Sequence, residues 1–373
     1  MRVVLVFTDI RRDLVAPLGC FRSLEVLLYY HTAYSDFAPG EMGDNLTRYR
    51  NAIGLFLRLW REKPDLVQGL EPFAIRLLPR TYAVLLATWM RRIPLYILSV
   101  ENRPLDEKHG PFFAPLERLL LRPVFNRARA IIYVSEGVRR NVLSVGPYGD
   151  KLERLMYGTW GVDPEEFSPL RDGREPDLGA GPAVLFVGRL HVEKGIWVLL
   201  EAFGLVREQM PTARLVLVGQ GSEQSAIERE VARRGWQEAV VLVGPVKNRD
   251  LPPYLRAAQV VVSPSLTTRK WEEQVGMVNI QAMACGVPVV STQSGAIAEY
   301  VPDGQVGLLV PERDPRALAE GVLRLLGDEA LRRRMGAAGR AHALEHYDAR
   351  LNVAQAEEWL LGLLAQIRSA RGA

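Results

Sequence analysis

The sequence predicts an α/β protein with two doubly wound parallel sheets. Three observations indicate this fold class: short β-branched runs alternate with segments of helical period, the chain has 373 residues, and a charged segment rich in Gly and Pro interrupts the alternation near its middle. Such alternation is typical of parallel strands covered by helices. A chain of this length usually forms more than one domain, so we expect two, each with its own core.

The first half contains short apolar runs that we expect to be strands. They cover residues 3–7, 66–68, 95–100, 130–134 and 155–157. The opening run is too short for a membrane span or a secretory signal, because charge returns at Asp9. The two cysteines, Cys20 and Cys285, lie far apart and offer no disulfide framework, so we expect a cytoplasmic protein.

The segment "RDGREPDLGAGP", residues 171–182, has no apolar period and is predicted to be a linker. The first domain is therefore expected over residues 1–170 and the second over residues 171–347. Residues 348–373 have a helical period and are expected to cross back to the first domain. The second domain should have strands at residues 183–187, 215–218, 240–243, 260–262, 287–290 and 307–310.

The charge balance limits the possible partners. With 47 Lys and Arg against 43 Asp and Glu, the net charge of +4 is too small to indicate nucleic-acid binding. Residues 45–63 and 76–92 mix Arg with Leu, Trp and Tyr at helical spacing. They could provide a peripheral membrane contact, although helices that simply cover a sheet are the alternative. His342 and His346 lack the glutamate and third ligand of a zinc site, so no metal is expected.

The segment "AVLFVGRLHVEKG" predicts a phosphate site. A buried strand ends at Gly188, a loop carries Arg189 and Lys194, and Gly195 opens a helix. The carboxyl edge of a parallel sheet, with a helix start and cations, is where such folds bind phosphorylated ligands. The alternative is that both side chains are solvated loop cations.

The segment "RLVLVGQGSEQ" places Gly219 and Gly221 after the next strand. Because Gln224 stands where a third glycine would be, the dinucleotide-binding pattern is not met. A tight turn is the simpler interpretation, against which a ribose or base could still pack.

The segment "WEEQVGMVNIQAMACGVPVV" combines a carboxylate, a glycine and a helix start. Glu273 lies in a loop, and Gly276, Met277 and Val278 would offer backbone N–H groups at the start of a helix that also carries Gln281. A carboxylate beside a phosphate site fits if Glu273 holds the hydroxyl groups of an attached sugar. The alternative is a pair of solvated loop glutamates.

Together these segments resemble the donor-binding domain of retaining glycosyltransferases of family 4, which have the GT-B fold of two Rossmann-like domains facing a central cleft. "FVGRLHVEKG" is similar to the family's phosphate-binding motif, and "EEQVGMVNIQAMACGVPVV" to its E-x7-E segment. "VGPVKNRDLPPYLRAAQVVVSPS", which contains Val246, resembles the segment that lines the base pocket. In the first half, "AIIYVSEGVRRNVLSVG" and "YGTWGVDPEEFSPL" resemble the family more loosely.

The resemblance implies transfer of a sugar from a nucleotide-sugar donor to a glycan, lipid-linked or small-molecule acceptor, with retention of anomeric configuration and without a metal or other cofactor. It implies that Arg189 and Lys194 hold the diphosphate and that Glu273 holds sugar hydroxyls. The remaining donor-binding residues would be Gly19, Gly188, Gly219, Gly221, Val246, Gly276, Met277, Val278 and Gln281.

Two positions depart from the family pattern. The second glutamate of E-x7-E, which holds ribose hydroxyls in the family, is Gln281 here, at a cost of about 1 kcal/mol in donor binding. In "ILSVENRP", Glu101 and Asn102 stand where many relatives have a histidine, and either could contact sugar or acceptor. Glu101 joins Arg189, Lys194 and Glu273 as a catalytic candidate, whereas Asn102 and His109 in the following loop are acceptor-side candidates, His109 as a possible substitute for the histidine. Two alternatives stay open: a nucleotide-sugar epimerase, which would use the same donor site without an acceptor, and a sugar-nucleotide-binding protein with weakened catalysis, with which the two departures are compatible.

Overall fold

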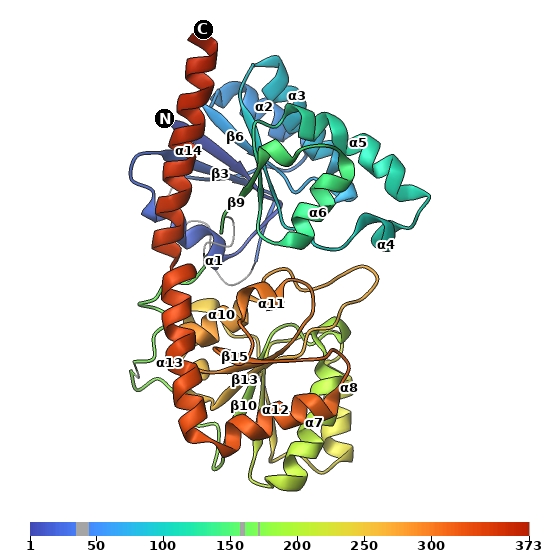
Figure 1. Ribbon diagram of the computed structural model, residues 1–373, viewed down its shortest axis with the longest axis vertical. Helices are drawn as coiled ribbons and strands as arrows, with labels where there is room; N and C mark the ends of the chain where they lie inside the picture. The colour runs from blue at the N-terminus through green and yellow to red at the C-terminus, as the bar shows by residue number, and fades with distance from the viewer. Residues whose placement is uncertain (35–44, 157–160, 171, 373) are drawn as a thin grey trace. The chain divides into compact units, whose positions relative to one another are not determined.

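The computed structural model describes residues 1–34, 45–156, 161–170 and 172–372 (Figure 1). The chain divides into two compact units. Unit 1 comprises Met1–Gly161 and Ala349–Ala373, and unit 2 comprises Val162–Asp348. No helix in the described ranges is long and apolar enough to cross a membrane.

Unit 1 contains a parallel sheet of seven described strands in the order β5-β3-β1-β6-β7-β8-β9. Their bounds are β1 (Arg2–Val6), β3 (Glu25–Tyr30), β5 (Leu46–Arg48), β6 (Leu66–Gly69), β7 (Leu95–Ser99), β8 (Ile131–Tyr133) and β9 (Leu152–Arg154), with a separate small pair of β2 (Asp9–Ile10) and β4 (Thr32–Ala33). The helices are α1 (Arg12–Val15), α2 (Ala52–Glu62), α3 (Leu78–Met90), α4 (Leu105–His109), α5 (Phe113–Arg127), α6 (Glu136–Val145) and α14 (Ala349–Gly372).

Unit 2 contains a parallel sheet of six described strands in the order β12-β11-β10-β13-β14-β15. The strands are β10 (Ala183–Val187), β11 (Arg214–Val218), β12 (Val240–Gly244), β13 (Val260–Ser263), β14 (Val289–Thr292) and β15 (Gly307–Val310). The helices are α7 (Ile196–Gln209), α8 (Gln224–Arg233), α9 (Pro252–Ala257), α10 (Met277–Ala284), α11 (Ile297–Tyr300), α12 (Pro315–Gly327) and α13 (Glu329–His346). The two parallel sheets confirm the predicted fold class.

The strands predicted for the seven-stranded sheet of unit 1 need three corrections, and the separate pair β2 and β4 was not predicted. The last strand is β9 at Leu152–Arg154 and not residues 155–157, of which residue 157 lies outside the described residues. This edge strand carries exposed charged residues and has no apolar run, so the strand was predicted at the apolar residues that follow it. Strands β3 and β5 were not predicted: β3 is apolar on both faces and lacks alternation, whereas β5 is a polar edge strand with no apolar run.

Helix α14 packs on unit 1. Its buried residues Val353, Leu360 and Leu364 belong to the core of that unit. The Glu357 carboxylate accepts hydrogen bonds from the backbone N–H groups of Arg22, Ser23 and Leu24, at 2.7–3.2 Å. The end of the chain is therefore held to unit 1 by apolar packing and by a carboxylate that satisfies three consecutive N–H groups.

Replacing Glu357 by glutamine should lower the free energy of unfolding by about 2–3 kcal/mol, because a neutral amide replaces an acceptor of charge-assisted hydrogen bonds. Urea unfolding measures this change. Glu358 is the matched control, because it is exposed on the same helix turn. Equal unfolding midpoints for Glu357→Gln and Glu358→Gln would contradict the assignment.

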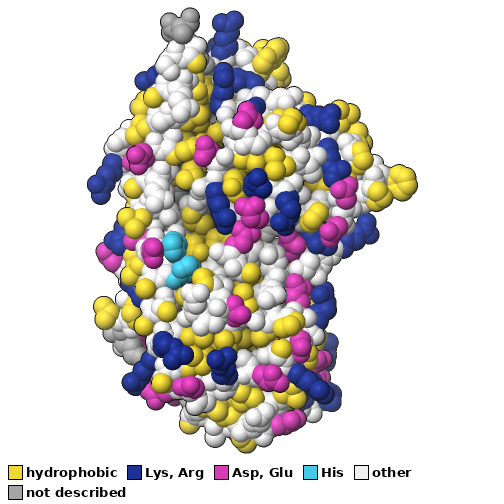
Figure 2. Space-filling model, in the orientation of Figure 1, with side chains coloured by type: hydrophobic (Ala, Val, Ile, Leu, Met, Phe, Trp, Pro, Cys, Tyr) yellow, Lys and Arg dark blue, Asp and Glu magenta, His cyan; other side chains and the backbone are white. Residues whose placement is uncertain are grey.

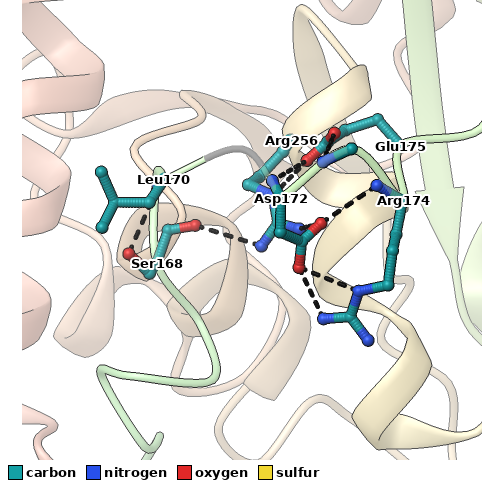
Figure 3. Close-up of polar contacts among 7 residues, drawn as sticks. Ser168, Leu170, Asp172, Arg174, Glu175 and Arg256 are labelled. Carbon is teal, nitrogen blue, oxygen red and sulfur yellow. Dashed lines mark hydrogen bonds and ion pairs between the residues drawn. The ribbon is translucent and has the colours of Figure 1, made fainter.

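Residues 172–182 of the predicted linker form no helix or strand, but side chains among them are bound to the rest of unit 2. The buried Arg256 of α9 donates to Glu175 Oε1 at 2.8 Å and to Asp172 Oδ1 at 2.7 Å (Figure 3). A buried guanidinium requires such carboxylate partners. Unit 2 also begins earlier than residue 171, since the Val162 N–H donates to the Tyr347 carbonyl and Arg340 donates to the Phe167 carbonyl.

Candidate functional site

The carboxyl edge of the unit 2 sheet brings Lys194 and Glu273 together. Lys194 ends the short 3₁₀ turn after β10, and Glu273 lies in the loop between β13 and α10. Lys194 Nζ lies 2.6 Å from Glu273 Oε2 and 4.5 Å from the centre of the Trp271 ring. The Ser265 hydroxyl donates to the same carboxylate oxygen at 2.8 Å. Residues 79 positions apart in sequence thus form one ion pair beside two helix starts.

The two helix starts are those of α7 and α10. Gly195 is the N-cap of α7 with φ of 70°, and Gly276 is the N-cap of α10 with φ of 70°. Helix α10 begins at Met277, and because the first N–H groups of a helix lack intrahelical partners, Met277 and Val278 present donors at this edge. Donors, a cation and a carboxylate together can hold a molecule that has both phosphate and hydroxyl groups.

Arg189 is more loosely held than Lys194. Its side chain is 57% exposed, and its Nη2 lies 3.5 Å from Glu193 Oε1. A long exposed side chain of this kind can turn toward an anion at little cost. The structure therefore places both cations in the predicted loop. The Arg189 side chain is exposed to solvent, whereas the Lys194 side chain is held by its ion pair with Glu273.

Gly219 and Gly221 form a tight turn against the loop that follows β10. A Cβ atom on Gly219 would lie 1.9 Å from the Gly188 carbonyl oxygen, and one on Gly221 would lie 2.2 Å from the Leu190 carbonyl oxygen. Glycine at these two positions thus allows the loops that follow β10 and β11 to lie close together. This packing accounts for both glycines without a bound ligand. Val246 lies half-buried in the loop that follows β12, at the same edge of the sheet.

Gln281 lies inside α10 and is 5% exposed. Among the residues that the structure describes, none forms a hydrogen bond with its side-chain amide. No atom of this amide is among the fully buried, unpaired polar atoms of the described residues, so solvent reaches the amide and a ligand hydroxyl could take the place of water there. Gln281 therefore keeps its place among the candidate donor-binding residues.

Replacing Gln281 by glutamate is expected to lower the melting temperature of the free protein, because a buried carboxylate without a partner is unfavourable. The same change should increase the stabilisation by a bound nucleotide sugar, since ribose hydroxyls would then donate to a charged acceptor. Thermal shift with and without donor measures both effects. Exposed Gln305→Glu is the control, and equal donor-induced shifts for the two variants would contradict a donor contact at Gln281.

The candidate acceptor-side residues of unit 1 lie in a network of their own. Glu101 pairs with Lys108 and accepts from the Arg103 N–H at 3.0 Å. Asn102 is 3% exposed, and its Oδ1 accepts from the Ser135 hydroxyl, which caps α6. His109 is the last residue of α4, and its Nδ1 lies 2.5 Å from Glu117 Oε2. His109 thus lies in a helix and not in the loop that was expected, it is paired with a buried carboxylate, and Asn102 has a structural role in holding α6.

Gly19 does not lie in an open loop. It belongs to a short 3₁₀ helix at Ala16–Cys20, it is exposed, and a Cβ atom there would meet nothing within 4 Å. No close backbone approach within unit 1 requires glycine at this position. The assignment of Gly19 to donor binding stays a prediction from the resemblance.

The sequence analysis did not identify Glu71, which follows β6 and accepts hydrogen bonds from the Ser99 hydroxyl at 2.9 Å and the Val100 N–H at 2.6 Å. Burial, with the nearby Glu101 carboxylate, raises the pKa of Glu71 to about 7. A carboxylate directly after a buried strand, in "LVQGLEPF", was the available signal. Glu71 and Glu101 mark the carboxyl edge of the unit 1 sheet as a site where a carboxyl group changes charge near neutral pH.

The Glu71 carboxyl group should make stability depend on pH. Its pKa is raised from 4.5 to about 7 on folding, so the folded state binds more protons between these values. The free energy of unfolding is therefore expected to fall by roughly 2–3 kcal/mol as the pH rises from about 4.5 to about 7. Denaturant unfolding across this range should show a shallower decline for Glu71→Gln, and an identical slope in both proteins would contradict the raised pKa.

Comparison with known proteins decides the family. Residues 181–328 match the family model described as "Glycosyl transferases group 1". A GDP-mannose-dependent alpha-(1-6)-phosphatidylinositol monomannoside mannosyltransferase of Mycolicibacterium smegmatis is 33% identical over 255 residues, covering 66% of this chain and 66% of that protein. The chain belongs to the group 1 glycosyltransferases.

Other curated members of this glycosyltransferase family match over a shorter span. The D-inositol 3-phosphate glycosyltransferase of Pseudarthrobacter chlorophenolicus is 33% identical over 207 residues, covering 53% of this chain and 48% of that protein. The chain thus spans about half to two thirds of the length of these relatives. The family predicted from the motifs is confirmed.

Solved structures of similar fold cover almost the whole chain. Anabaena Alr3699/HepE, in complex with UDP and glucose, has a TM-score of 0.79 at 18% identity, covering 96% of this chain and 99% of that chain. Sucrose-phosphate synthase from Thermosynechococcus elongatus has a TM-score of 0.72 at 21% identity, covering 97% and 99%. These likenesses confirm the GT-B type of fold in this glycosyltransferase family member.

Proposed function

We propose that the chain transfers a sugar from a nucleotide-sugar donor to an acceptor. The observation that carries this proposal is the ion pair of Lys194 and Glu273 at the carboxyl edge of the unit 2 sheet, beside the N-termini of α7 and α10. A nucleotide sugar combines a diphosphate with sugar hydroxyls. The site offers a cation and N–H donors for the first and a carboxylate for the second.

Each residue has a definite task in this proposal. Lys194 and Arg189 bind the diphosphate and stabilise the negative charge that builds up on the departing nucleotide, which is the work of a metal ion in other enzymes. Glu273 accepts hydrogen bonds from sugar hydroxyls. A cation held in place at Lys194, with Arg189 able to turn toward the ligand, supports a reaction that needs no metal. We propose that this reaction retains the anomeric configuration, as in the family that the motifs resemble.

The acceptor is proposed from the names of the relatives. These names mention a phosphatidylinositol monomannoside and an inositol 3-phosphate, which are a glycolipid and a small phosphorylated polyol. We propose a glycan, lipid-linked or small-molecule acceptor that the protein meets in the cytoplasm, with peripheral contact at the membrane. The basic, apolar helices α2 and α3 of unit 1 support that contact.

A panel of radiolabelled nucleotide sugars, incubated with the protein and with candidate acceptors, tests the proposal. Transfer of label from at least one donor is the expected result, and a panel without binding, hydrolysis or transfer would overturn it. Analysis of the product distinguishes a transferase from an epimerase, since an epimerase returns a nucleotide sugar of altered configuration. Binding without turnover would indicate a protein with weakened catalysis.

A further inference from the structure

Unit 1 has an apolar groove between helices α2, α3 and α5. Its volume is about 680 Å³, within the usual range of ligand pockets, and its walls include Ile53, Phe56, Tyr82, Leu86, Trp89 and Pro123. Ile53 is 71% exposed and Trp89 is 64% exposed. The helices also bury a separate apolar face against the sheet, for example through Leu55 and Leu59 of α2. The groove is therefore a second apolar surface that packing of the fold does not require.

A cationic pocket adjoins this groove. The two share Trp89 and Arg127, and the pocket adds Arg92 and Arg129 in a volume of about 680 Å³. Within the described ranges, the Arg129 guanidinium forms no hydrogen bond or ion pair, and its side chain is exposed. An apolar groove that continues into a group of guanidinium groups fits a molecule with an apolar chain and an anionic head.

The charge on the three helices favours an anionic partner. Helices α2, α3 and α5 contain two acidic residues, Glu62 and Glu117. Glu62 pairs with Arg2 at 2.5 Å, and Glu117, with a side chain that is 2% exposed, lies 2.5 Å from His109. Both carboxylates are thus engaged within unit 1. The charge that these helices present to solvent is cationic, although the whole chain carries only +4.

The first turns of α5 extend the apolar surface. Phe112 and Phe113 are 90% and 68% exposed, and Leu116 is 53% exposed. Figure 2 shows exposed hydrophobic side chains with basic and some acidic ones among them on the face of unit 1 that is in view. Exposed aromatic residues among cations are typical of proteins that lie at a membrane surface.

We propose that the groove binds an acyl chain of an anionic phospholipid in the membrane, while Arg92 and Arg129 hold the phosphate of its head group. Arg127, whose Nη2 donates to the Thr88 and Ile93 carbonyls, adds positive charge beside them. This lipid is an anchor and not the sugar acceptor. Pro94 and Arg129 precede β7 and β8, so the cationic pocket lies at the amino ends of the strands. Glu71 and Glu101 follow the carboxyl ends of β6 and β7, at the opposite edge. The inference therefore does not rest on the proposed glycosyl transfer.

Calorimetric titration with dihexanoyl phosphatidylglycerol, below the concentration at which it forms micelles, tests the site itself. The expected result is binding of one lipid per chain. Arg129→Gln removes a head-group contact, and Ala83→Phe fills the groove, so each should weaken binding at least fivefold. The controls are Arg334→Gln and Leu351→Asn, both exposed on helices outside the groove. Unchanged affinity in both groove variants would overturn the proposal.

Vesicles test whether the site works at a membrane. Binding is expected to vesicles that contain phosphatidylglycerol and not to vesicles of phosphatidylcholine alone. Brominated acyl chains should quench Trp89 fluorescence, and Trp89→Phe should lose that quenching while Trp197→Phe retains it. If Ala83→Phe binds anionic vesicles as well as the unchanged protein does, the contact is surface adsorption and the groove proposal fails.

Two further measurements distinguish loss of lipid binding from misfolding of the variant and from coverage of the groove by a second copy of the chain. Should Ala83→Phe not fold, as judged by circular dichroism, Leu86→Asn replaces it, because Leu86 is 46% exposed. Analytical ultracentrifugation reports whether a second copy covers the groove, and a dimer that Leu86→Asn abolishes would overturn the lipid assignment. Lipid binding needs no nucleotide sugar, so a failed donor panel and a failed lipid titration are separate results.

Discussion

Replacing Lys194 by alanine is expected to lower kcat for donor turnover by about 10²–10³-fold, the usual effect of removing one preorganised donor from a developing negative charge. The Nζ atom is held by Glu273 at 2.6 Å and lies over the Trp271 ring, so it is in place before a ligand arrives. Binding of a nucleoside diphosphate should weaken more than binding of the bare nucleoside. Steady-state kinetics and calorimetry with the two ligands measure these effects.

Control variants distinguish the loss of positive charge at the phosphate site from a non-specific loss of activity. Arg324→Ala removes an exposed cation near the end of α12 in unit 2 and should leave turnover unchanged. Arg189→Ala should also weaken diphosphate binding, but less than Lys194→Ala does, because the Arg189 side chain is 57% exposed. If the Lys194→Ala variant loses affinity for nucleoside and nucleoside diphosphate equally, Lys194 does not belong to the phosphate site.

Replacing Gly195 by alanine is expected to have the largest effect on stability among these variants. Gly195 has φ of 70°, and a Cβ atom there would lie 1.8 Å from the Pro264 carbonyl oxygen. The left-handed conformation alone costs about 1–2 kcal/mol for alanine. Relieving the clash requires movement of backbone and costs about 1–3 kcal/mol more.

Gly235→Ala is the matched control for that experiment. Gly235 has φ of 68°, and nothing lies within 4 Å of its Cβ position. The difference in free energy of unfolding between the two variants therefore isolates the contact with Pro264. Equal losses would contradict the close approach of the α7 start to the loop after β13. Because Ser265 donates to Glu273, the movement should also lower donor affinity.

The sequence predicted the site in unit 2 better than that in unit 1, for a physical reason. Gly188, Lys194, Gly276 and Glu273 all follow strands of one parallel sheet, and strand ends of such a sheet meet at one edge. The Lys194–Glu273 ion pair was not predicted, because it depends on how the loop after β13 folds back. That loop is fixed by distant contacts, such as those of Thr267 with Glu312.

Local sequence patterns indicate less about the site in unit 1. Glu101, Asn102 and His109 are close in sequence, but their partners Ser135 and Glu117 come from later helices that no local pattern indicates. Strand β3 was not predicted, because a strand that is buried on both faces does not alternate between apolar and polar residues. The apolar groove was also not predictable, since it depends on which face of each helix packs on the sheet.

The position of α14 has a consequence for how the chain folds during synthesis. Unit 2 is one continuous stretch, and it is inserted between the two segments that make up unit 1. The Glu357 carboxylate and the buried Val353, Leu360 and Leu364 are translated after all of unit 2. Domains generally fold as soon as their residues are available. The second unit in the sequence can therefore complete its core on the ribosome, whereas the first must wait for the final helix.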